Sequence, residues 1–364
     1  MKRASFGLIF ALALVQHALA EDAVCGKTAR DIYSAAGRSV VEIYTRSVNP
    51  LLVQGRVQAG SGTGFLIEGD HVVTNYHVVA GASRIVMFLG DNAERAQVVG
   101  IDPASDIAVL KPDHLFLFDG VPRLSFETAP PEMGAPVWAI GFPLGLGETI
   151  SQGIVSGLNR VDTRHTVDWE TPDIQIDASI SPGNSGGPVL DDCGKVVGMS
   201  TKAINPQYGE NLAFAIPAQA MAPIVAEIIR QGHVSRPWHG LYGKMLSEPI
   251  MSLLGIPYEQ WGMVYGFLVE TVEPGSAADR AGLRGGDFPV RLGGTEFLLG
   301  GDIITEVNGV RIESLDTALE VVRALKIGDR VTLTYMRAGQ AHSASVTLEE
   351  RPLLPEELAL YRHD

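Results

Sequence analysis

Short apolar segments dominate the chain between residues 40 and 216. They are rich in β-branched residues, and Gly, Asp or Pro separates them about every ten residues. They are residues 40–44, 64–67, 71–74, 84–89, 96–101, 107–110, 137–140 and 196–200. This spacing predicts an all-β unit, a barrel or a sandwich, and residues 28–37 before it favour a short helix.

A helical pattern follows these strands. Pro217 stands where a first helical residue would be, and Gly232 comes just after the last turn. Between them, apolar residues recur on one helix face: Met221, Ile224, Val225, Ile228 and Ile229. We interpret residues 233–237 as a linker, because a second pattern starts at residue 238. That pattern mixes strands at 267–271, 303–307, 331–336 and 343–348 with a helix at 315–325, which predicts a small α+β domain at 238–351.

The N-terminus has the features of a secretory signal. Lys2 and Arg3 precede an apolar run at residues 6–15, and Ala18 and Ala20 frame a small-x-small cleavage site. We expect a signal peptide at residues 1–20 and a first domain at 21–232. A membrane anchor is the alternative, but the run spans only about 15 Å as a helix, half of a bilayer core. A lipoprotein is disfavoured because Val24 precedes the cysteine.

Length and charge limit the function classes. The 364 residues suit two domains, and 46% hydrophobic with 19% charged residues is typical of a globular chain. Lys and Arg number 28 against 42 Asp and Glu, so the net charge is −14. Nucleic acid is therefore excluded as a main partner, and anionic membrane surfaces are disfavoured.

The only cysteines are Cys25 and Cys193. In an exported chain, an even number of cysteines favours a disulfide. One bond would close a long loop and stabilise the fold by about 5 kcal/mol in the chain-entropy model. Two free thiols are the alternative that the sequence leaves open.

A glycine-framed serine is the sharpest chemical feature. Residues 183–188 are GNSGGP, and such glycines let the N–H groups of Gly183 and Ser185 point at one spot, as an oxyanion hole requires. A turn with a bystander serine is the alternative. His77 follows an apolar strand and Asp106 precedes another, so a base and an orienting group come in the order His, Asp, Ser. An α/β-hydrolase has the order Ser, Asp, His and a helix after the serine, whereas a hairpin follows here.

Seven motifs occur in the order found in the HtrA/Deg serine proteases, and the chain resembles that family over residues 60–217. They are GSGTGF at 60–65, TNYHVV at 74–79, DIAVL at 106–110, GFP at 141–143, QGIVS at 152–156, GNSGGP at 183–188 and FAIP at 214–217. The resemblance implies a chymotrypsin-like double β-barrel protease domain followed by one PDZ domain. It implies a triad of His77, Asp106 and Ser185, with an oxyanion hole at Gly183 and Ser185. It also implies a periplasmic homotrimer that cleaves unfolded or misfolded proteins and needs no metal or cofactor.

Substrate preference depends on the pocket near the serine. An acid at its base would favour Lys or Arg before the scissile bond. Ile180, Leu212 and Ala213 are the predicted lining residues, and none of them is acidic. We therefore expect a preference for small or medium aliphatic side chains.

The C-terminal domain resembles a PDZ domain less cleanly. Tyr265, Gly266, Phe267 and Leu268 fit a loop whose N–H groups hold a peptide carboxylate, with the next strand pairing with the peptide. Leu319 and Val322 would line its side-chain pocket; ordinary core packing is the alternative. The motif GGD occurs twice, at 285–287 and 300–302, which favours an inserted hairpin at 287–301 in which 288–291 pairs with 296–299 around Gly293 and Gly294. Residues 352–364 form a C-terminal tail.

Two other functions compete with an active protease. A peptide-binding sensor or chaperone would keep the triad residues with little resting activity. A structural scaffold ranks last, since it has no need of three matching catalytic segments.

Overall fold

The computed structural model describes residues 25–48, 56–160, 172–203, 211–260, 264–292 and 295–361. The predicted signal peptide at 1–20 lies outside these ranges. Within them, no helix combines the length and the apolar character that crossing a bilayer would need.

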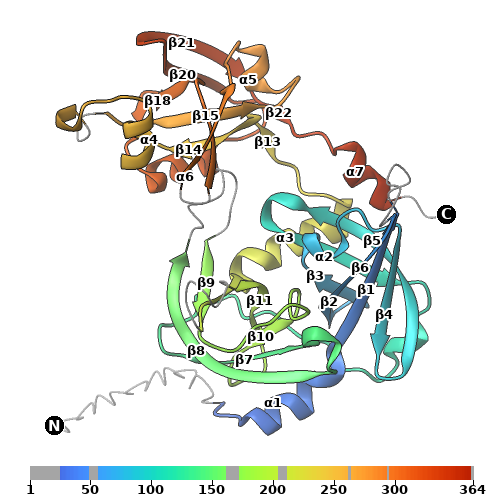
Figure 1. Ribbon diagram of the computed structural model, residues 1–364. Coiled ribbons are helices and arrows are strands. Elements are labelled where there is room, and N and C mark those ends of the chain that lie inside the picture. Colours follow the sequence, from blue (N-terminus) through green and yellow to red (C-terminus); the bar gives the residue numbers. More distant parts are fainter. Residues whose placement is uncertain are drawn as a thin grey trace, which may run out of the picture.

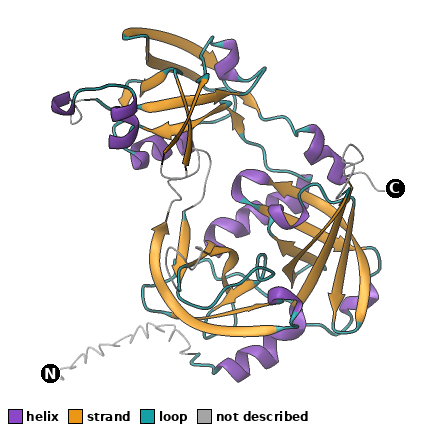
Figure 2. Cartoon of the chain, viewed as in Figure 1, coloured by secondary structure: helices purple, strands orange, loops and turns teal. Residues whose placement is uncertain are grey.

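Two closed barrels of six strands each form the first part of the chain (Figures 1 and 2). The first has the strand order β1-β2-β3-β6-β5-β4 and contains β1 (Val40–Val48), β2 (Val57–Ile67), β3 (His71–Thr74), β4 (Arg84–Leu89), β5 (Asn92–Asp102) and β6 (Ile107–Pro112). The second has the order β10-β11-β12-β9-β8-β7 and contains β7 (Pro136–Gly141), β8 (Thr149–Arg160), β9 (Asp173–Ile176), β10 (Pro188–Leu190), β11 (Val196–Ala203) and β12 (Ala213–Pro217). The all-β class is confirmed, in its barrel form.

A cluster of buried residues from both barrels joins them, in addition to a core inside each barrel. Helix α3 (Ala218–Gln231) supplies Met221, Val225 and Ile228 to this cluster, and each is at most 2% exposed. These residues lie on the face that the apolar spacing predicts. Pro217 belongs to β12 and caps the helix, so α3 begins one residue later than expected.

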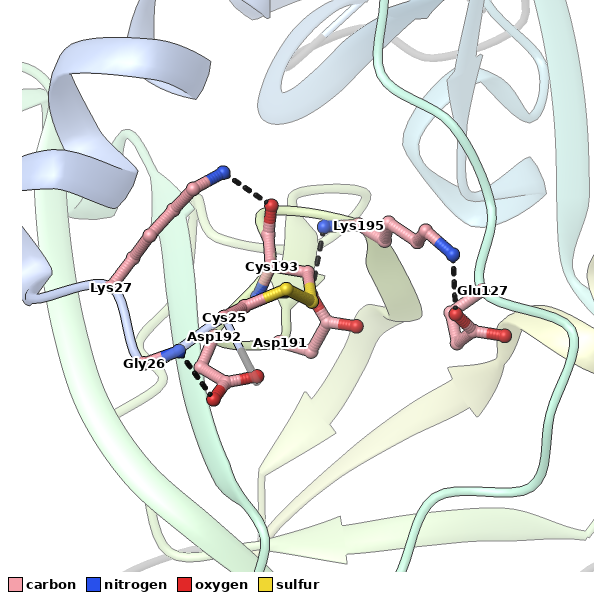
Figure 3. The surroundings of a disulfide bond; sticks show 8 residues. All are labelled: Cys25, Gly26, Lys27, Glu127, Asp191, Asp192, Cys193 and Lys195. Atoms are coloured by element: carbon pink, nitrogen blue, oxygen red, sulfur yellow. Dashed lines mark hydrogen bonds and ion pairs between the residues drawn. A yellow bond between two sulfur atoms is a disulfide. The ribbon is translucent and has the colours of Figure 1, made fainter. Parts of the chain in front are cut away.

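A disulfide fixes the N-terminal segment to the second barrel (Figure 3). Cys25 lies just before helix α1 (Ala29–Ala36), and Cys193 lies in the turn between β10 and β11. Their Cα atoms are 4.9 Å apart and the two sulfurs are bonded, so free thiols are ruled out in this structure. Lys27 Nζ also donates a hydrogen bond to the carbonyl of Cys193, at 2.6 Å. The short segment η1 (Gly37–Ser39) joins α1 to β1, whereas η3 (Leu115–Phe118) lies between β6 and β7 and η4 (Pro143–Gly145) lies between β7 and β8.

The C-terminal domain has a main sheet with helices on both faces. The strand order is β14-β15-β18-β20-β21, with β19 paired to β18. Its strands are β14 (Leu241–Met245), β15 (Phe267–Val272), β18 (Ile303–Val307), β19 (Val310–Arg311), β20 (Arg330–Arg337) and β21 (Gln340–Thr347); its helices are α4 (Glu248–Leu253), η5 (Tyr258–Gln260), α5 (Ala277–Arg280) and α6 (Leu315–Ala324). Side chains alternate along a strand, so Phe267 and Val269 pack with α5 and α6 whereas Leu268 packs with α4 on the other face.

Strands β16 (Phe288–Leu292) and β17 (Thr295–Leu299) form a separate antiparallel hairpin. Phe288 pairs with Leu299 and Arg291 pairs with Glu296, which is the register that the sequence predicts. The predicted turn glycines, 293 and 294, lie outside the described residues. Leu299 is 7% exposed and packs with Leu268, so the hairpin covers the α4 face of the main sheet.

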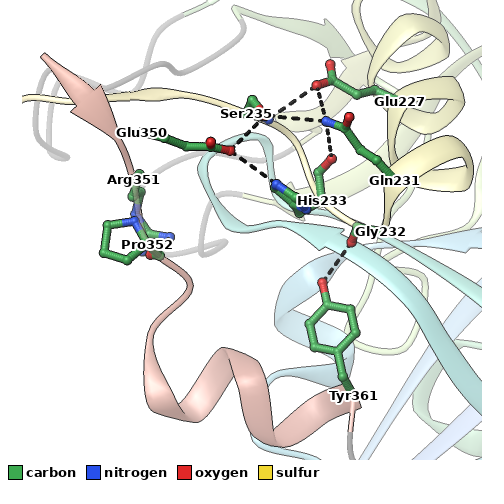
Figure 4. Close-up of polar contacts among 9 residues, drawn as sticks. All are labelled: Glu227, Gln231, Gly232, His233, Ser235, Glu350, Arg351, Pro352 and Tyr361. Atoms are coloured by element: carbon green, nitrogen blue, oxygen red, sulfur yellow. Dashed lines mark hydrogen bonds and ion pairs between the residues drawn. The ribbon is translucent and has the colours of Figure 1, made fainter. Parts of the chain in front are cut away.

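Two segments connect the C-terminal domain to the barrels (Figure 4). The first follows α3 and ends in β13 (Pro237–Trp238), which pairs with β22 (Glu349–Glu350). Ser235 Oγ, in this segment, donates to Glu350 Oε1 at 2.7 Å. The second contains α7 (Pro355–Leu358) and η6 (Ala359–Tyr361), and it returns Leu360 to the core cluster of the first barrel. The Tyr361 hydroxyl donates to the Gly232 carbonyl at 2.8 Å, so the two segments meet beside the barrel.

Candidate active site

His77 and Asp106 face each other from two connections of the first barrel. His77 lies in α2 (Tyr76–Val79), which follows β3, and Asp106 directly precedes β6. Strands β3 and β6 are paired, with Thr74 opposite Ala108, so the two connections meet at one end of the barrel. His77 Nδ1 lies 2.8 Å from Asp106 Oδ2, and the His77 backbone N–H donates to Asp106 Oδ1 at 2.9 Å.

The environment of His77 sets its protonation. Partial burial lowers the pKa of His77, but the hydrogen bond from the imidazole to Asp106 and the carboxylate charge outweigh it, so the pKa of His77 is raised above its ordinary value of 6.5. Because Nδ1 faces the carboxylate, Nε2 is the nitrogen that is left to take up a proton. The imidazole is 49% exposed, so a substrate can approach it.

Thr201, in β11, connects Ser185 to the pair of His77 and Asp106. Its hydroxyl donates to Asp106 Oδ2 at 3.0 Å, and its carbonyl accepts a hydrogen bond from the Ser185 hydroxyl at 3.1 Å. Among the described residues, Ser185 has no hydrogen bond to His77. The structure therefore brings the three predicted residues to one site, with the serine hydroxyl directed at a backbone carbonyl.

Two backbone amides of the serine loop, those of Gly183 and Ser185, have no acceptor among the described residues. Gly183 has a φ of +104°, and a Cβ there would lie 2.4 Å from the Phe142 carbonyl, so only glycine fits. The Pro182 carbonyl accepts a hydrogen bond from the Leu144 N–H at 2.9 Å. A trans peptide unit directs its carbonyl and its N–H to opposite sides, so the Gly183 N–H points away from Leu144. Neither this N–H nor that of Ser185 donates to another described group, so both can donate to an acceptor in the site.

Thr63, in β2, fixes the serine loop to the first barrel. Its side chain is fully buried, and its hydroxyl donates to the Gly183 carbonyl at 2.6 Å. Its backbone N–H donates to the Ser185 carbonyl at 2.8 Å. The same hydroxyl accepts from the Phe142 N–H at 3.1 Å. One buried threonine thus joins the segment at Phe142 to the serine loop at Gly183 and Ser185.

A cleft of about 460 Å³ opens beside His77 and Asp106. Its other lining residues include Thr201 and Lys202. The three predicted pocket residues lie elsewhere: Ile180 and Leu212 are half-buried, and Ala213 is 2% exposed in the core of the second barrel. Contact between these three side chains and a substrate stays a prediction.

The C-terminal domain contains a narrow apolar cavity of about 70 Å³ between its main sheet and α6. Phe267 and Val322, two of the predicted peptide-binding residues, line it. Leu319 is 2% exposed in the domain core. Tyr265 instead contacts Arg311, whose guanidinium lies 4.2 Å from the ring centre.

The prediction that a bound peptide pairs with the strand after Gly266 does not fit this sheet. At Phe267 and Leu268, β15 pairs with β14 on one side and with β18 on the other, so it has no free edge there. Strand β14 ends the main sheet, and its first residue, Leu241, lines the apolar cavity. Sequence reasoning missed β14 because Gly243 and Lys244 interrupt its apolar pattern.

Known proteins share both parts of the chain. The model of a trypsin-like peptidase domain matches residues 62–199, and that of a PDZ domain matches residues 247–348. Protease Do-like 1, chloroplastic, from Arabidopsis thaliana is 35% identical over 306 residues, which cover 81% of this chain and 65% of the relative. The chain belongs to the HtrA/Deg family of serine proteases. A second HtrA/Deg relative, Serine protease Do-like HtrA from Bacillus subtilis, is 32% identical over 81% of this chain and 64% of its own length.

Solved HtrA-type structures agree with this fold. The HtrA-type protease AlgW with decapeptide has a TM-score of 0.63 and 26% identity, over 89% of this chain and 98% of the other. The serine endoprotease from Yersinia pestis has a TM-score of 0.59 and 27% identity, over 88% and 97%. The barrels are thus the chymotrypsin-like pair of the HtrA/Deg family, followed by a PDZ domain. The chain spans between half and two thirds of the length of the curated relatives that it matches.

Sequence reasoning missed two residues of this HtrA/Deg site. Thr63 left a signal, since it is a polar residue in the middle of the glycine and apolar run at 60–67. Thr201 left none, because its contact with Asp106 joins residues 95 positions apart on different barrels.

Proposed function

We propose that this chain is an exported serine endopeptidase that cleaves unfolded or misfolded proteins. The hydrogen bond between Asp106 and His77 carries the proposal. Ser185 lies beside this pair, because Thr201 contacts both Asp106 and Ser185. In this role Asp106 orients the imidazole, His77 Nε2 is the general base and Ser185 Oγ is the nucleophile.

The reaction begins with a rotation of the Ser185 side chain. The hydroxyl leaves the Thr201 carbonyl and donates to His77 Nε2, which takes the proton as Oγ attacks the peptide carbonyl carbon. The oxyanion that forms accepts hydrogen bonds from the N–H groups of Gly183 and Ser185. His77 then passes the proton to the leaving amine, and an acyl-enzyme remains. A water molecule, deprotonated by His77, releases the acid and restores Ser185.

Small or medium aliphatic residues are the proposed preference before the scissile bond. Ile180 and Leu212 carry no charge, and Asp177, the acid closest to Ile180 in the sequence, is exposed and accepts from the Ile154 N–H at 2.6 Å. Sequencing the products of an unfolded substrate tests this preference. Predominant cleavage after Lys or Arg would contradict it.

The PDZ domain is proposed to bind peptide C-termini along β14 instead of β15. Strand β14 ends its sheet and begins beside the apolar cavity, which suits an added strand and an apolar terminal side chain. AlgW has been solved with a decapeptide and with a tripeptide. Amidating the terminal carboxylate should weaken binding to the Ser185→Ala full-length chain by about 1–3 kcal/mol. Calorimetry with the acid and amide forms of one peptide measures this, and equal affinities would reject carboxylate recognition.

Export and assembly complete the proposal. A signal peptide removed after Ala20 would deliver the chain to the periplasm, and relatives from Haemophilus influenzae and Chlamydia trachomatis are named as periplasmic proteases. A homotrimer is expected from the family alone. Mass spectrometry of the mature N-terminus and light scattering of the purified chain test both points.

A peptide-activated sensor or chaperone is the second candidate function. One observation favours it, namely that the Ser185 hydroxyl bonds to the Thr201 carbonyl and not to His77. Cleavage of unfolded casein by the wild type and by Ser185→Ala, each with and without a C-terminal peptide, separates the two. Cleavage by the wild type alone, without peptide, supports the protease; cleavage that needs the peptide supports the sensor; equal cleavage by both chains would reject Ser185 as the nucleophile.

A further inference from the structure

Arg236, in the segment that joins the two domains, reaches the turn before Asp106. Its Nε donates to Asp102 Oδ1 at 3.0 Å, and its Nη2 donates both to Asp102 Oδ2 and, at 2.8 Å, to Ser105 Oγ. The side chains of Arg236 and Asp102 are only 15% and 3% exposed. An ion pair shielded in this way is screened little by salt and holds its geometry well.

The contacted residues bracket the turn η2 (Pro103–Ser105). Asp102 immediately precedes it, and Ser105 is its last residue. Asp106 follows with φ 54° and ψ 43°, a left-handed conformation that L-residues adopt rarely. Such a conformation persists where the surrounding structure enforces it. Arg236 contacts both ends of η2, the turn that leads into the left-handed backbone of Asp106.

The backbone of Asp106 determines where its carboxylate points. The Asp106 carbonyl accepts from the Tyr76 N–H and from Asn75 Nδ2, each at 3.1 Å. Its two carboxylate oxygens meet the N–H and Nδ1 of His77. An aspartate side chain has only two torsions, so a shift of the turn displaces the carboxylate from the imidazole.

The backbone of Arg236 is itself held in place. Its carbonyl accepts from the Arg351 N–H at 2.8 Å, where β13 meets β22. Close by, His233 Nε2 lies 3.1 Å from Glu350 Oε1 (Figure 4). The guanidinium therefore extends toward η2 from a fixed base.

We propose that Arg236 is a positioning residue for proteolysis. By bracing both ends of η2, it maintains the left-handed backbone of Asp106 that aims the carboxylate at His77. This role rests on the proposed triad. A planar guanidinium suits it because it donates to Asp102 and Ser105 at once in fixed directions, which a lysine ammonium does not.

Kinetics of the full-length chain test the proposal, with Arg236→Gln, Arg236→Lys and a matched control, Arg337→Gln. Arg337 makes a similar two-bond pair with Asp302, at 2.7 Å for both bonds, but in the PDZ domain. With a short peptide substrate, Arg236→Gln should lower kcat by about 10- to 100-fold, as misplacement of catalytic groups does, with KM changed by less than about twofold. The acidic limb of the profile of kcat/KM against pH should move to lower pH, because His77 loses the support of Asp106. Arg236→Lys should recover part of kcat, and Arg337→Gln should keep the wild-type kcat and limb.

Ser105→Ala covers the case in which Arg236→Gln does not fold. It removes the contact of Arg236 with Ser105 and leaves the ion pair with Asp102. We therefore expect a lower kcat and a shift of the acidic pH limb to lower pH, both smaller than in Arg236→Gln. The proposal would be overturned if a folded Arg236→Gln variant had the kcat and the acidic pH limb of the wild type. If Arg236→Gln does not fold, the same result for Ser105→Ala would overturn it. So would an equal loss in Arg337→Gln. Failure of the triad itself is distinguishable, because His77→Ala and Ser185→Ala would then retain activity.

Discussion

The two barrels differ in how far their candidate catalytic groups are arranged for the proposed reaction. In the first barrel, Asp106 already holds His77 through two hydrogen bonds, and Thr201 adds a third to the carboxylate. In the second, the Gly183 and Ser185 amides donate to no other described group, but the Ser185 hydroxyl bonds to the Thr201 carbonyl. In the proposed mechanism, His77 is therefore oriented before a substrate arrives, and the Ser185 side chain is the part that must move.

Removing the nucleophile should have the largest effect. Ser185→Ala should lower kcat for a peptide substrate by about 10⁶-fold, since the triad acts as a unit. Its unfolding midpoint should hardly change, because the hydroxyl makes a single described hydrogen bond, to a carbonyl. Ser181→Ala, in the same loop, is the control and should keep wild-type kcat; activity near wild type in Ser185→Ala would contradict the mechanism.

Altering the orienting group should come next. Asp106→Asn keeps the shape of the side chain but favours the wrong imidazole tautomer, so kcat should fall by about 10⁴-fold. Asp113→Asn removes an exposed carboxylate that bonds to Gln97 and should leave kcat unchanged. A loss below about tenfold in Asp106→Asn would mean that the preformed pair in the first barrel matters little.

The disulfide tests how far the second barrel depends on its N-terminal anchor. Replacing Cys25 and Cys193 together by alanine should lower the free energy of unfolding by about 2–5 kcal/mol. Urea titration of the oxidised wild type, the reduced wild type and the variant measures this, and the last two should agree. Identical midpoints for all three would show that α1 docks equally well without the bond.

A change of pH alone tests the role of His77 and needs no substitution. The raised pKa of His77 means that the base form is lost as pH falls through a value above 6.5. Activity should then drop by about tenfold for each further pH unit. A profile that stays flat down to pH 5 would be inconsistent with His77 as the base.

The structure brings together the three residues that the motifs single out, but the motifs did not predict the contacts between them. His77, Asp106 and Ser185 each lie in a contiguous motif, so the residues next to them in the sequence are enough to single them out. The bond from Ser185 to Thr201, and the brace by Arg236, join segments that are distant in the chain, and no local pattern encodes them. The prediction that a peptide pairs with β15 of the PDZ domain was wrong for a related reason. Residues 265–268 have the composition of a binding loop, but whether the following strand has a free edge depends on the strand order, in which β14 and β18 flank β15.

Labelling with a fluorophosphonate probe tests the central claim most directly, because the probe bonds to a serine that a neighbouring base activates. The wild type should gain one adduct, and peptide mapping should place it on Ser185. The same reaction with His77→Ala should give none over the same period. An adduct on another serine, or equal labelling of Ser185 without His77, would contradict the account.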